Sequence, residues 1–415
     1  MAQYQSQFRI LFLIVVLISL FVGLTIANYR YAEQFPGGND FLARWMGARY
    51  WLVYGVSPYE SEVSEASQKA IYGRLAKPVD GEDVAHFVYP LNSMIFFGLF
   101  GLLEYVPARA IWMTLLEFSL IGLAFISLRM TGWNIPLIKK GLIVLFTVLW
   151  YHGARTILLG QFAGINALLI VISIYLILEH HDYGAGLMIS LTTAKPQMVF
   201  LLIPFILIWA FSKRRWELWW GVLTGLFVQF ALTLILLPQW PRQFMYQLLD
   251  YPKYTDTGSP LSIIASQMPG IYTPVNIFLN GIFLIYLLVE WFVVLRKGDH
   301  YFLWTAMMTL VISNLVAYRT ATTNNIVLIP VMFYIFRIAE ERWHIIGKVF
   351  VYFALLAFGI GLWILFFKSV SGNIENPIMY LPFPLFCLAG LWWIRWWATR
   401  APRLPIESFR TPISK

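Results

Sequence analysis

The sequence predicts an all-α fold, a polytopic membrane bundle of about 12 transmembrane helices. Of its 415 residues, 59% are hydrophobic and 12% are charged, about half the charged share of a soluble protein. A water-soluble domain could not cover so much apolar surface, whereas a bilayer is the natural solvent for it. The chain has 18 Trp, many of them at the ends of apolar runs, as in the aromatic belts of membrane proteins.

The apolar runs approach the roughly 20 residues needed to cross a bilayer. The first run, 10–28, is long and lacks a small-x-small cleavage pattern, so we expect a retained transmembrane helix. Two segments are ambiguous, because Pro90 interrupts 87–106 and because 182–194 is short and rich in Gly, Ser and Thr. The other expected spans are 107–130, 137–151, 157–179, 196–212, 217–237, 274–295, 301–318, 323–338, 345–368 and 378–398.

The distribution of charge predicts the orientation of these spans. By the positive-inside rule, the basic clusters in short loops belong in the cytoplasm. The net charge of +9 is therefore assigned to membrane topology, and we expect no nucleic-acid partner. The single cysteine, Cys387, excludes an internal disulfide and a cysteine-based metal site. The basic clusters are Lys139-Lys140, Lys213 to Arg215, Arg296-Lys297, Arg337 to Arg342, and Arg395 with Arg400 and Arg403.

Two long loops belong on the outer side. Segment 29–87 carries eight acidic and six basic residues, and 239–273 follows a complete apolar run. If 29–87 lies outside and the cluster at 213–215 lies in the cytoplasm, an odd number of spans must separate them. Six candidate spans lie between them, so one does not cross the membrane. Pro90 makes 87–106 the better choice. We therefore expect a single transmembrane domain over 1–415, with both termini cytoplasmic, in the plasma membrane.

The first outer loop contains an amphipathic segment at 40–54. Phe41, Trp45 and Leu52 are apolar, whereas Arg44 and Arg49 are basic. This pattern predicts a helix that lies in the membrane interface.

Asp40 follows the turn sequence of residues 36–39 and is expected to be the N-cap of this helix. A carboxylate at the mouth of an outer cavity could also be a general base. Arg44, one turn further on, could pair with it.

Lys195 is the clearest charge between apolar runs. Charged residues at membrane depth are costly and are usually functional, and the helix break at Pro196 next to this cation suits a phosphate. The alternative is that Lys195 extends its side chain to the interface.

Arg155 and Gln161 lie in a stretch of small and polar residues that could instead serve close helix packing. Arg319 is a further outer cation, either an anion ligand or an interfacial anchor. No Walker loop, GxGxxG fingerprint or zinc-protease motif is present. We expect no cofactor and no metal, and the outward polar residues indicate a lipid-borne substrate.

The chain resembles glycosyltransferase family 87, within the GT-C superfamily of membrane glycosyltransferases, from about residue 38 to residue 330. The outward Asp40 is followed in order by short motifs of that family: GVSPYE at 55–60, FVYPL at 87–91, LLGQFAGIN at 158–166, TTAKPQ at 192–197 and NIVLIP at 325–330.

The resemblance implies a GT-C bundle that transfers a sugar, often mannose, from a polyprenyl phosphate to a glycolipid or glycan acceptor. Transfer would invert the anomeric centre on the outer face without a nucleotide cofactor. Asp40 would deprotonate the acceptor hydroxyl, and Lys195 with nearby arginines would hold the donor phosphate. The expected donor- or substrate-binding residues are Arg44, Tyr59, Tyr89, Arg155, Gln161, Asn166, Lys195, Arg319 and Asn324.

Three departures from the family pattern are visible. The Y-P-P motif is Tyr89-Pro90-Leu91 here, and G-Q-x-N is spread over 160–166. The polar turn that often holds a His has Thr323, Asn324 and Asn325 instead.

Two other functions compete with the transferase. A secondary transporter or lipid flippase would favour inverted repeats and short loops, which the sequence does not show. An O-antigen-ligase-like lipid-dependent polymerase would share the outward basic cavity.

Overall fold

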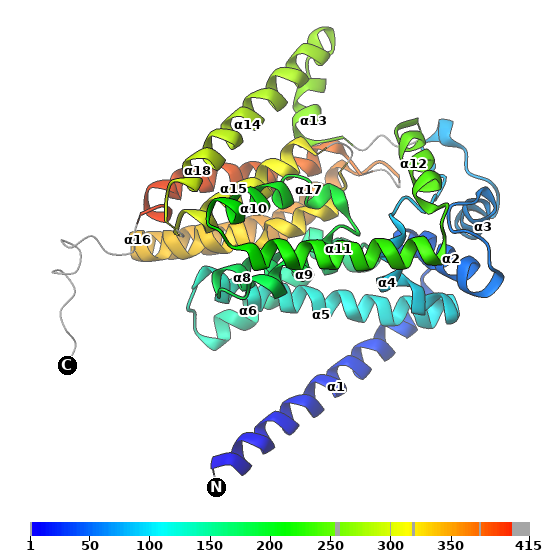
Figure 1. Ribbon diagram of the computed structural model, residues 1–415, viewed down its shortest axis with the longest axis horizontal. Coiled ribbons are helices and arrows are strands. Elements are labelled where there is room, and N and C mark those ends of the chain that lie inside the picture. Colours follow the sequence, from blue (N-terminus) through cyan, green and yellow to red (C-terminus); the bar gives the residue numbers. More distant parts are fainter. Residues whose placement is uncertain (1, 254–257, 299, 318–319, 373–374, 401–415) are drawn as a thin grey trace, which may run out of the picture.

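The computed structural model describes residues 2–253, 258–298, 300–317, 320–372 and 375–400. Helices make up 82% of the chain, and the described residues contain no strand. The expected all-α class is therefore confirmed. Most long helices run lengthwise through one bundle (Figure 1).

Six helical segments among the described residues are long and apolar enough to cross a membrane. A seventh is present if the pair α6 (Leu137–Leu149) and α7 (Tyr151–Leu159), bent by 52°, counts as one span. These segments make the chain a polytopic membrane protein, although they do not establish the expected 12 spans. The six contain α1 (Ala2–Gln34), α5 (Tyr105–Thr131), α11 (Trp216–Leu236), α14 (Tyr272–Leu295), α16 with α17 (Ile329–Leu356 and Leu362–Ser369) and α18 (Pro382–Ala398).

Several of the other expected spans are short helices that end near one another. The left-handed Gly160 (φ 71°) ends α7, as glycine does at a helix C-terminus. Pro196 lies in the break between α9 and α10, where a helix cannot continue without loss of a hydrogen bond. The short helices and the turn before α16 are α8 (Ala163–Leu178), α9 (Asp182–Thr192), η4 (Pro196–Met198), α10 (Leu202–Ser212), α15 (His300–Val316) and η7 (Thr322–Leu328).

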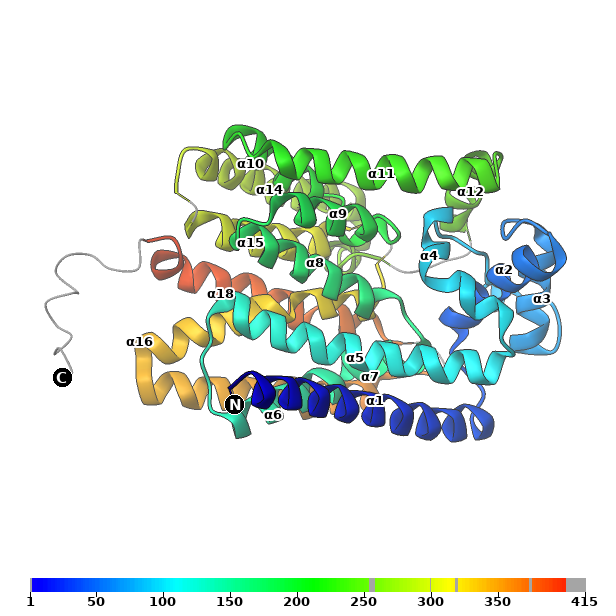
Figure 2. The ribbon, with the colours of Figure 1, turned by 60° about the horizontal axis from the view of Figure 1, so that its bottom comes forward.

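The helical run that begins at α16 changes direction at His344. This residue has φ 44° and ψ −109°, which breaks the helix. The two halves then lie side by side (Figure 2), and a Cβ on Gly347 would meet the Ala339 carbonyl oxygen at 2.1 Å. The two spans expected at 323–338 and 345–368 thus agree with the break. The π-helical turn η8 (Ala357–Gly361) leads into α17.

Helices from both expected outer loops lie at one end of the bundle. Figures 1 and 2 place α2 (Asn39–Tyr54), α3 (Ser61–Tyr72), α4 (Met94–Phe97) and α12 (Trp240–Asp250) together at this end. We call it the loop end.

The ambiguous segment 87–106 does not form one long helix. It contains η2 (Leu91–Ser93), α4 and η3 (Gly98–Leu102); we call residues 91–102 the broken element. The remaining short elements are η1 (Pro78–Asp80), η5 (Tyr251–Lys253), α13 (Pro260–Ser266), η6 (Pro269–Ile271) and η9 (Pro377–Tyr380).

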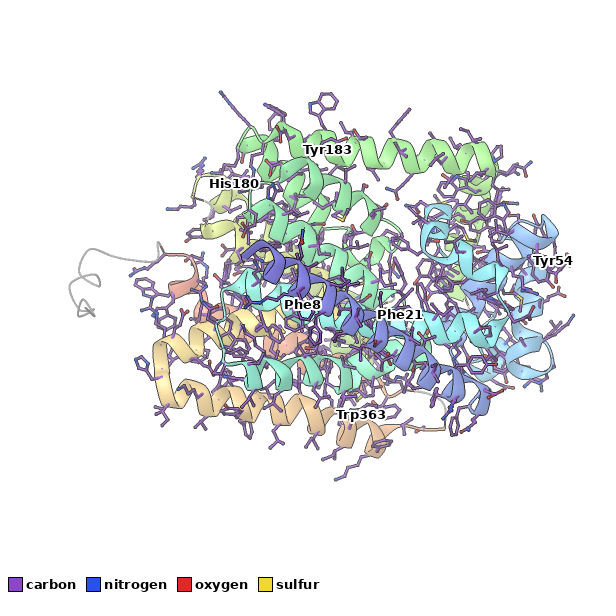
Figure 3. All side chains as sticks on the ribbon, turned by 90° about the horizontal axis from the view of Figure 1, so that it is seen from below. Phe8, Phe21, Tyr54, His180, Tyr183 and Trp363 are labelled. Carbon is purple, nitrogen blue, oxygen red and sulfur yellow. The ribbon has the colours of Figure 1, made fainter. Side chains whose placement is uncertain are left out.

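Several basic clusters meet at the opposite end. Lys139 forms an ion pair with Glu340, and Lys213 Nζ donates a 2.7 Å hydrogen bond to the Lys297 carbonyl oxygen. His180, in a turn at this end, and Tyr54, which ends α2, lie far apart in Figure 3. The fold therefore separates these basic turns from the loop end, as the charge pattern predicts.

Candidate functional site

A polar cavity of about 310 Å³ lies at the loop end. Its walls come from α2, the chain before the broken element, the α7–α8 and α9–α10 turns, α12 and η7. The structure thus brings six of the expected site residues together: Asp40, Arg44, Tyr89, Gln161, Lys195 and Asn324.

The start of α2 differs from its sequence-based prediction. The helix begins at Asn39, and Gly38, with φ 72°, is its N-cap. Asp40 therefore lies in the first turn, and its predicted N-cap role is wrong. Arg109 explains why position 38 is a glycine, because a Cβ on Gly38 would meet Arg109 Nε at 2.8 Å. The side chain of Asp40 is free to line the cavity.

The residue after Asp40 fixes α2 against the interior. Phe41 is fully buried and stacks on Trp112, with ring centroids 5.1 Å apart. A Cβ on Gly160 would lie 2.5 Å from Phe41 Cβ. Trp112 Nε1 also donates a 2.9 Å hydrogen bond to the Gly160 carbonyl oxygen. Phe41 therefore sets the position of Asp40 relative to Gln161, which follows Gly160.

Arg44 connects Asp40 to the wall of the cavity. Its Nη1 lies 3.9 Å from Asp40 Oδ1, and its guanidinium carbon lies 4.6 Å from the centroid of the Tyr89 ring. Tyr59 lies behind this wall, where its hydroxyl donates a 2.8 Å hydrogen bond to the Tyr89 carbonyl oxygen. Burial raises the pKa of Tyr89 to about 12, so its phenol is neutral near pH 7. Tyr59 supports the site and does not line it.

Lys195 brings a buried positive charge to the cavity. The residue is 2% exposed, and its Nζ donates a 2.8 Å hydrogen bond to Gln161 Oε1. This burial contradicts the alternative in which the side chain extends to the interface. The Gln161 amide is neutral, so this hydrogen bond does not offset the positive charge, which is attracted to Asp40 in the same cavity. Such a charge is costly to bury and suits an anionic group in the cavity.

Asn324 closes the far side of the cavity from η7. It is 2% exposed, and its Nδ2 donates a 2.8 Å hydrogen bond to Thr320 Oγ1. Its Oδ1 is buried and has no hydrogen-bond partner among the residues that the structure describes. The predicted site residue Arg319 lies outside the described residues.

Asn166 and Arg155 do not line the cavity. Asn166 is fully buried, with its Nδ2 3.6 Å from Met198 Sδ. Arg155 Nη2 lies 3.4 Å from Glu375 Oε2, which also accepts a 2.9 Å hydrogen bond from Thr322 Oγ1. The hydroxyl of Tyr151 donates to Glu375 Oε1 over 2.6 Å. Arg155 therefore belongs to a polar cluster around Glu375, which contacts η7 through Thr322.

Sequence reasoning missed other residues at or near the cavity. Gln197, Phe244 and Tyr251 line it, and of these only Gln197, in the TTAKPQ motif, carried a signal. His152 is fully buried, with its Nε2 3.3 Å from Asn325 Nδ2. A histidine thus contacts the polar turn before α16 from a different helix, α7.

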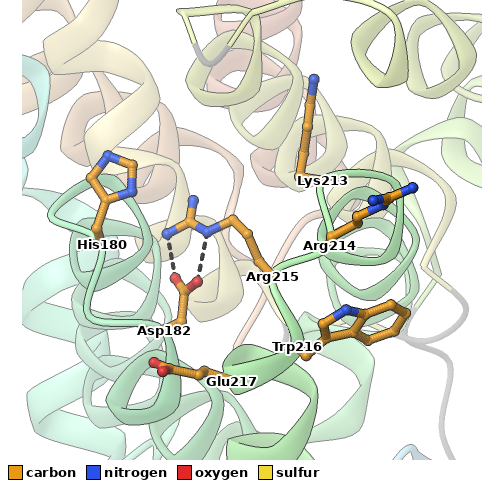
Figure 4. Close-up of a pocket in the computed structure, with 7 residues that line it drawn as sticks. All are labelled: His180, Asp182, Lys213, Arg214, Arg215, Trp216 and Glu217. Atoms are coloured by element: carbon orange, nitrogen blue, oxygen red, sulfur yellow. Dashed lines mark hydrogen bonds and ion pairs between the residues drawn. The ribbon is translucent and has the colours of Figure 1, made fainter.

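A larger hollow of about 530 Å³ lies at the opposite end, around the turn between α10 and α11. Figure 4 shows Arg215 paired with Asp182, and Arg215 Nε donates a 2.7 Å hydrogen bond to Asp182 Oδ2. This pairing offsets the charge of Arg215, whereas the hydrogen bond of Lys195 goes to the neutral Gln161 amide. The cavity at the loop end is therefore the better candidate site.

The helices and the cavity define an integral membrane protein with a polar site at one end of its bundle. The family model of glycosyltransferase family 87 matches residues 87–318, more than half of the chain, and the chain belongs to this family. It is therefore a membrane glycosyltransferase. The match includes Tyr89, Gln161 and Lys195, whereas Asp40 and Asn324 lie outside it. No curated protein and no solved structure matches the chain.

Proposed function

We propose that the protein transfers a sugar, mannose by family resemblance, from a polyprenyl phosphate to a glycolipid or glycan acceptor. The observation that carries this proposal is the cavity in which Asp40 and the buried Lys195 take part together. Glycosyl transfer needs a base for the acceptor hydroxyl and positive charge for the leaving phosphate. One cavity offers both.

The proposed reaction inverts the anomeric centre in one displacement. The acceptor oxygen bonds to the anomeric carbon as the bond from that carbon to the phosphate oxygen breaks. Asp40 takes the hydroxyl proton, and the polyprenyl phosphate leaves with the electron pair. Lys195, oriented by Gln161, and Arg44 stabilise the negative charge that develops on the phosphate. Tyr89 holds Arg44 in place.

The proposed topology is a GT-C bundle of about 12 passages in the plasma membrane, with α2 in the outer interface. The loop end faces outward and both termini lie in the cytoplasm. The separation of 29–87 from the basic turns supports this orientation. An outward site has no supply of nucleotide sugars, which favours a lipid-linked donor. No feature of the cavity favours the transporter or polymerase alternatives over the family assignment.

The proposal is tested by incubating the purified protein with radiolabelled polyprenyl-phosphate-mannose and a membrane lipid extract, and measuring label in glycolipid. We expect wild-type transfer and loss of transfer in Asp40→Asn. Asp80→Asn is the matched control, because Asp80 is exposed at the same end and does not line the cavity. Wild-type rates in Asp40→Asn would exclude Asp40 as the base. Transfer from a nucleotide sugar alone would overturn the donor class.

A further inference from the structure

A small polar hollow of about 10 Å³ lies next to the cavity at the loop end. Gln197 and Asn324 line both spaces, so the two adjoin at the α9–α10 turn and at η7. A space of this size holds about one water-sized group. None of the described residues that line the hollow is charged. The hollow therefore suits a single neutral polar group and not an ion.

Three residues on the walls of the hollow have a buried polar atom without a partner. Ser313 Oγ, Asn314 Oδ1 and Asn324 Oδ1 make no hydrogen bond to a described residue, and the three residues are 2%, 6% and 2% exposed. Elsewhere on α15, the Thr305 hydroxyl donates to the Tyr301 carbonyl oxygen over 2.9 Å. Buried polar groups are nearly always paired, so three unpaired ones around one hollow indicate a ligand.

The three atoms complement a ligand hydroxyl group. The amide oxygens of Asn314 and Asn324 only accept hydrogen bonds, whereas the hydroxyl of Ser313 can also donate. A ligand hydroxyl would donate its proton to one amide oxygen, and Ser313 would donate to the ligand oxygen or to the other amide. A water molecule fits the same atoms and is the competing occupant.

We propose that the hollow receives the 6-hydroxyl of a hexose on the donor, so that Ser313 and Asn314 select a hexosyl over a 6-deoxyhexosyl or pentosyl donor. The inference rests on the proposed function and deepens it by naming the class of sugar. Gln197 follows Lys195 by two residues, so a sugar on a phosphate at Lys195 lies beside the hollow. The hydroxymethyl group stands one carbon out from a hexopyranose ring, and it can enter a space that is too small for the ring.

The test compares undecaprenyl-phosphate donors that carry mannose, 6-deoxymannose or 4-deoxymannose. A site whose buried polar groups bind a substrate hydroxyl rejects an analogue that lacks it. Because water can replace the missing hydroxyl, we expect wild-type kcat/KM for 6-deoxymannose to be about 10- to 100-fold below that for mannose.

Two variants remove the polar atoms without touching the cavity at the loop end, which neither Asn314 nor Ser313 lines. Asn314→Leu should lower kcat/KM for mannose to the value for 6-deoxymannose and should leave the latter unchanged. Ser313→Ala should have a smaller effect in the same direction. Thr305→Val is the matched control, because Thr305 is buried on the same helix and lines neither space. It should keep the wild-type preference.

Three kinetic outcomes would overturn the proposal. Equal use of mannose and 6-deoxymannose by the wild type would leave the hollow to water. An equal loss with both donors in Asn314→Leu would show that this residue has a structural role only. If the variants instead abolish a preference for mannose over 4-deoxymannose, the hollow takes a ring hydroxyl and not the 6-hydroxyl.

Ligand-induced thermal shifts give a second measurement that does not need turnover. Undecaprenyl-phosphate-mannose should raise the thermal midpoint of the wild type more than its 6-deoxy analogue does, and the two shifts should be equal in Asn314→Leu. Equal shifts in the wild type would overturn the hexose site. Unequal shifts without transfer from any lipid-linked donor would overturn the proposed reaction and leave the hexose site in place.

Discussion

Lys195 Nζ donates a 2.8 Å hydrogen bond to Gln161 Oε1, and the lysine side chain is almost completely buried. A buried ammonium with a neutral partner costs stability, so Lys195→Met should leave the thermal midpoint unchanged or raise it. Transfer should fall about 10- to 100-fold, because a hydrogen bond to a charged group contributes about 1.5–3 kcal/mol. The donor KM should rise. Thermal unfolding in detergent and donor kinetics measure the two effects.

Lys69→Met is the control for this prediction, because Lys69 is exposed on α3 and makes only a 3.9 Å ion pair with Glu65. Its kinetics and midpoint should match wild type. A Lys195→Met protein that keeps its donor KM would remove Lys195 from the phosphate site.

Gly160→Ala is expected to impair catalysis through the position of Asp40. Alanine at φ 71° costs about 1–2 kcal/mol, and its Cβ would press on Phe41. Gly55→Ala is the matched control, since Gly55 has φ 70° and open space around it. Both variants should lose similar stability from the backbone, whereas only Gly160→Ala should also lose kcat. Equal kcat values in the two variants would show that the Phe41 contact does not set the geometry of the site.

Arg155→Gln should affect stability more than donor binding. Arg155 contacts Glu375, and its guanidinium carbon lies 5.4 Å from the Phe366 ring centroid, behind η7. We expect a lower thermal midpoint and a donor KM within about twofold of wild type. Arg155→Lys should recover part of the midpoint. A KM increase comparable to that of Lys195→Met would instead return Arg155 to the donor site.

His86 predicts a pH dependence of stability. Burial lowers the pKa of His86, and the carboxylates of Asp250 and Asp83 offset part of this effect. The unfolded chain, with a histidine pKa near 6.5, therefore takes up a proton at His86 more readily than the folded protein does. Stability attributable to His86 should be complete above that value and should decline as the pH falls below it.

The measurement is the thermal midpoint between about pH 7.5 and 5.5, a range that spans the unfolded histidine pKa. His86→Gln should lose less stability than wild type over this range. His181→Gln, an exposed position, should follow wild type. Parallel curves for all three proteins would refute the role of His86.

The proposed orientation can be tested with introduced thiols, because the single native cysteine, Cys387, is fully buried. Glu62→Cys on α3 should react with an impermeant maleimide in intact cells. Glu217→Cys at the start of α11 should react only after the membrane is opened. The reverse pattern would place the loop end in the cytoplasm and exclude an outward site.

Much of the fold was predictable from composition and charge. Apolar length located α5, α11, α14 and α18, and basic loops grouped the turns at one end, because both follow from transfer to a bilayer. The helices around the cavity were harder to predict from the sequence. Helices α8, α10 and α15 are shorter than a span, since they stop at turns whose positions depend on tertiary packing.

The candidate site was predictable where a residue was chemically out of place. Lys195 was found because a charge between apolar runs is costly, and Asp40 because it follows a turn at the start of the outer amphipathic segment. Arg155 looked equivalent by that criterion, but its partner Glu375 is 220 residues away in sequence. The N-cap of α2 was predicted two residues too late, at Asp40 instead of Gly38, because Arg109, which leaves no room for a Cβ at position 38, decides it. Pairings over such distances leave no local pattern.

The lengths of the short helices beside the cavity also bear on how deep in the bilayer the cavity lies. At about 1.5 Å per residue, α10 with 11 residues covers about 17 Å and α8 with 16 residues about 24 Å, against a hydrocarbon core of about 30 Å. In the proposed topology, their turns near the cavity would fall below the bilayer surface. The proposed lipid-borne phosphate would then reach Lys195 without being lifted out of the membrane.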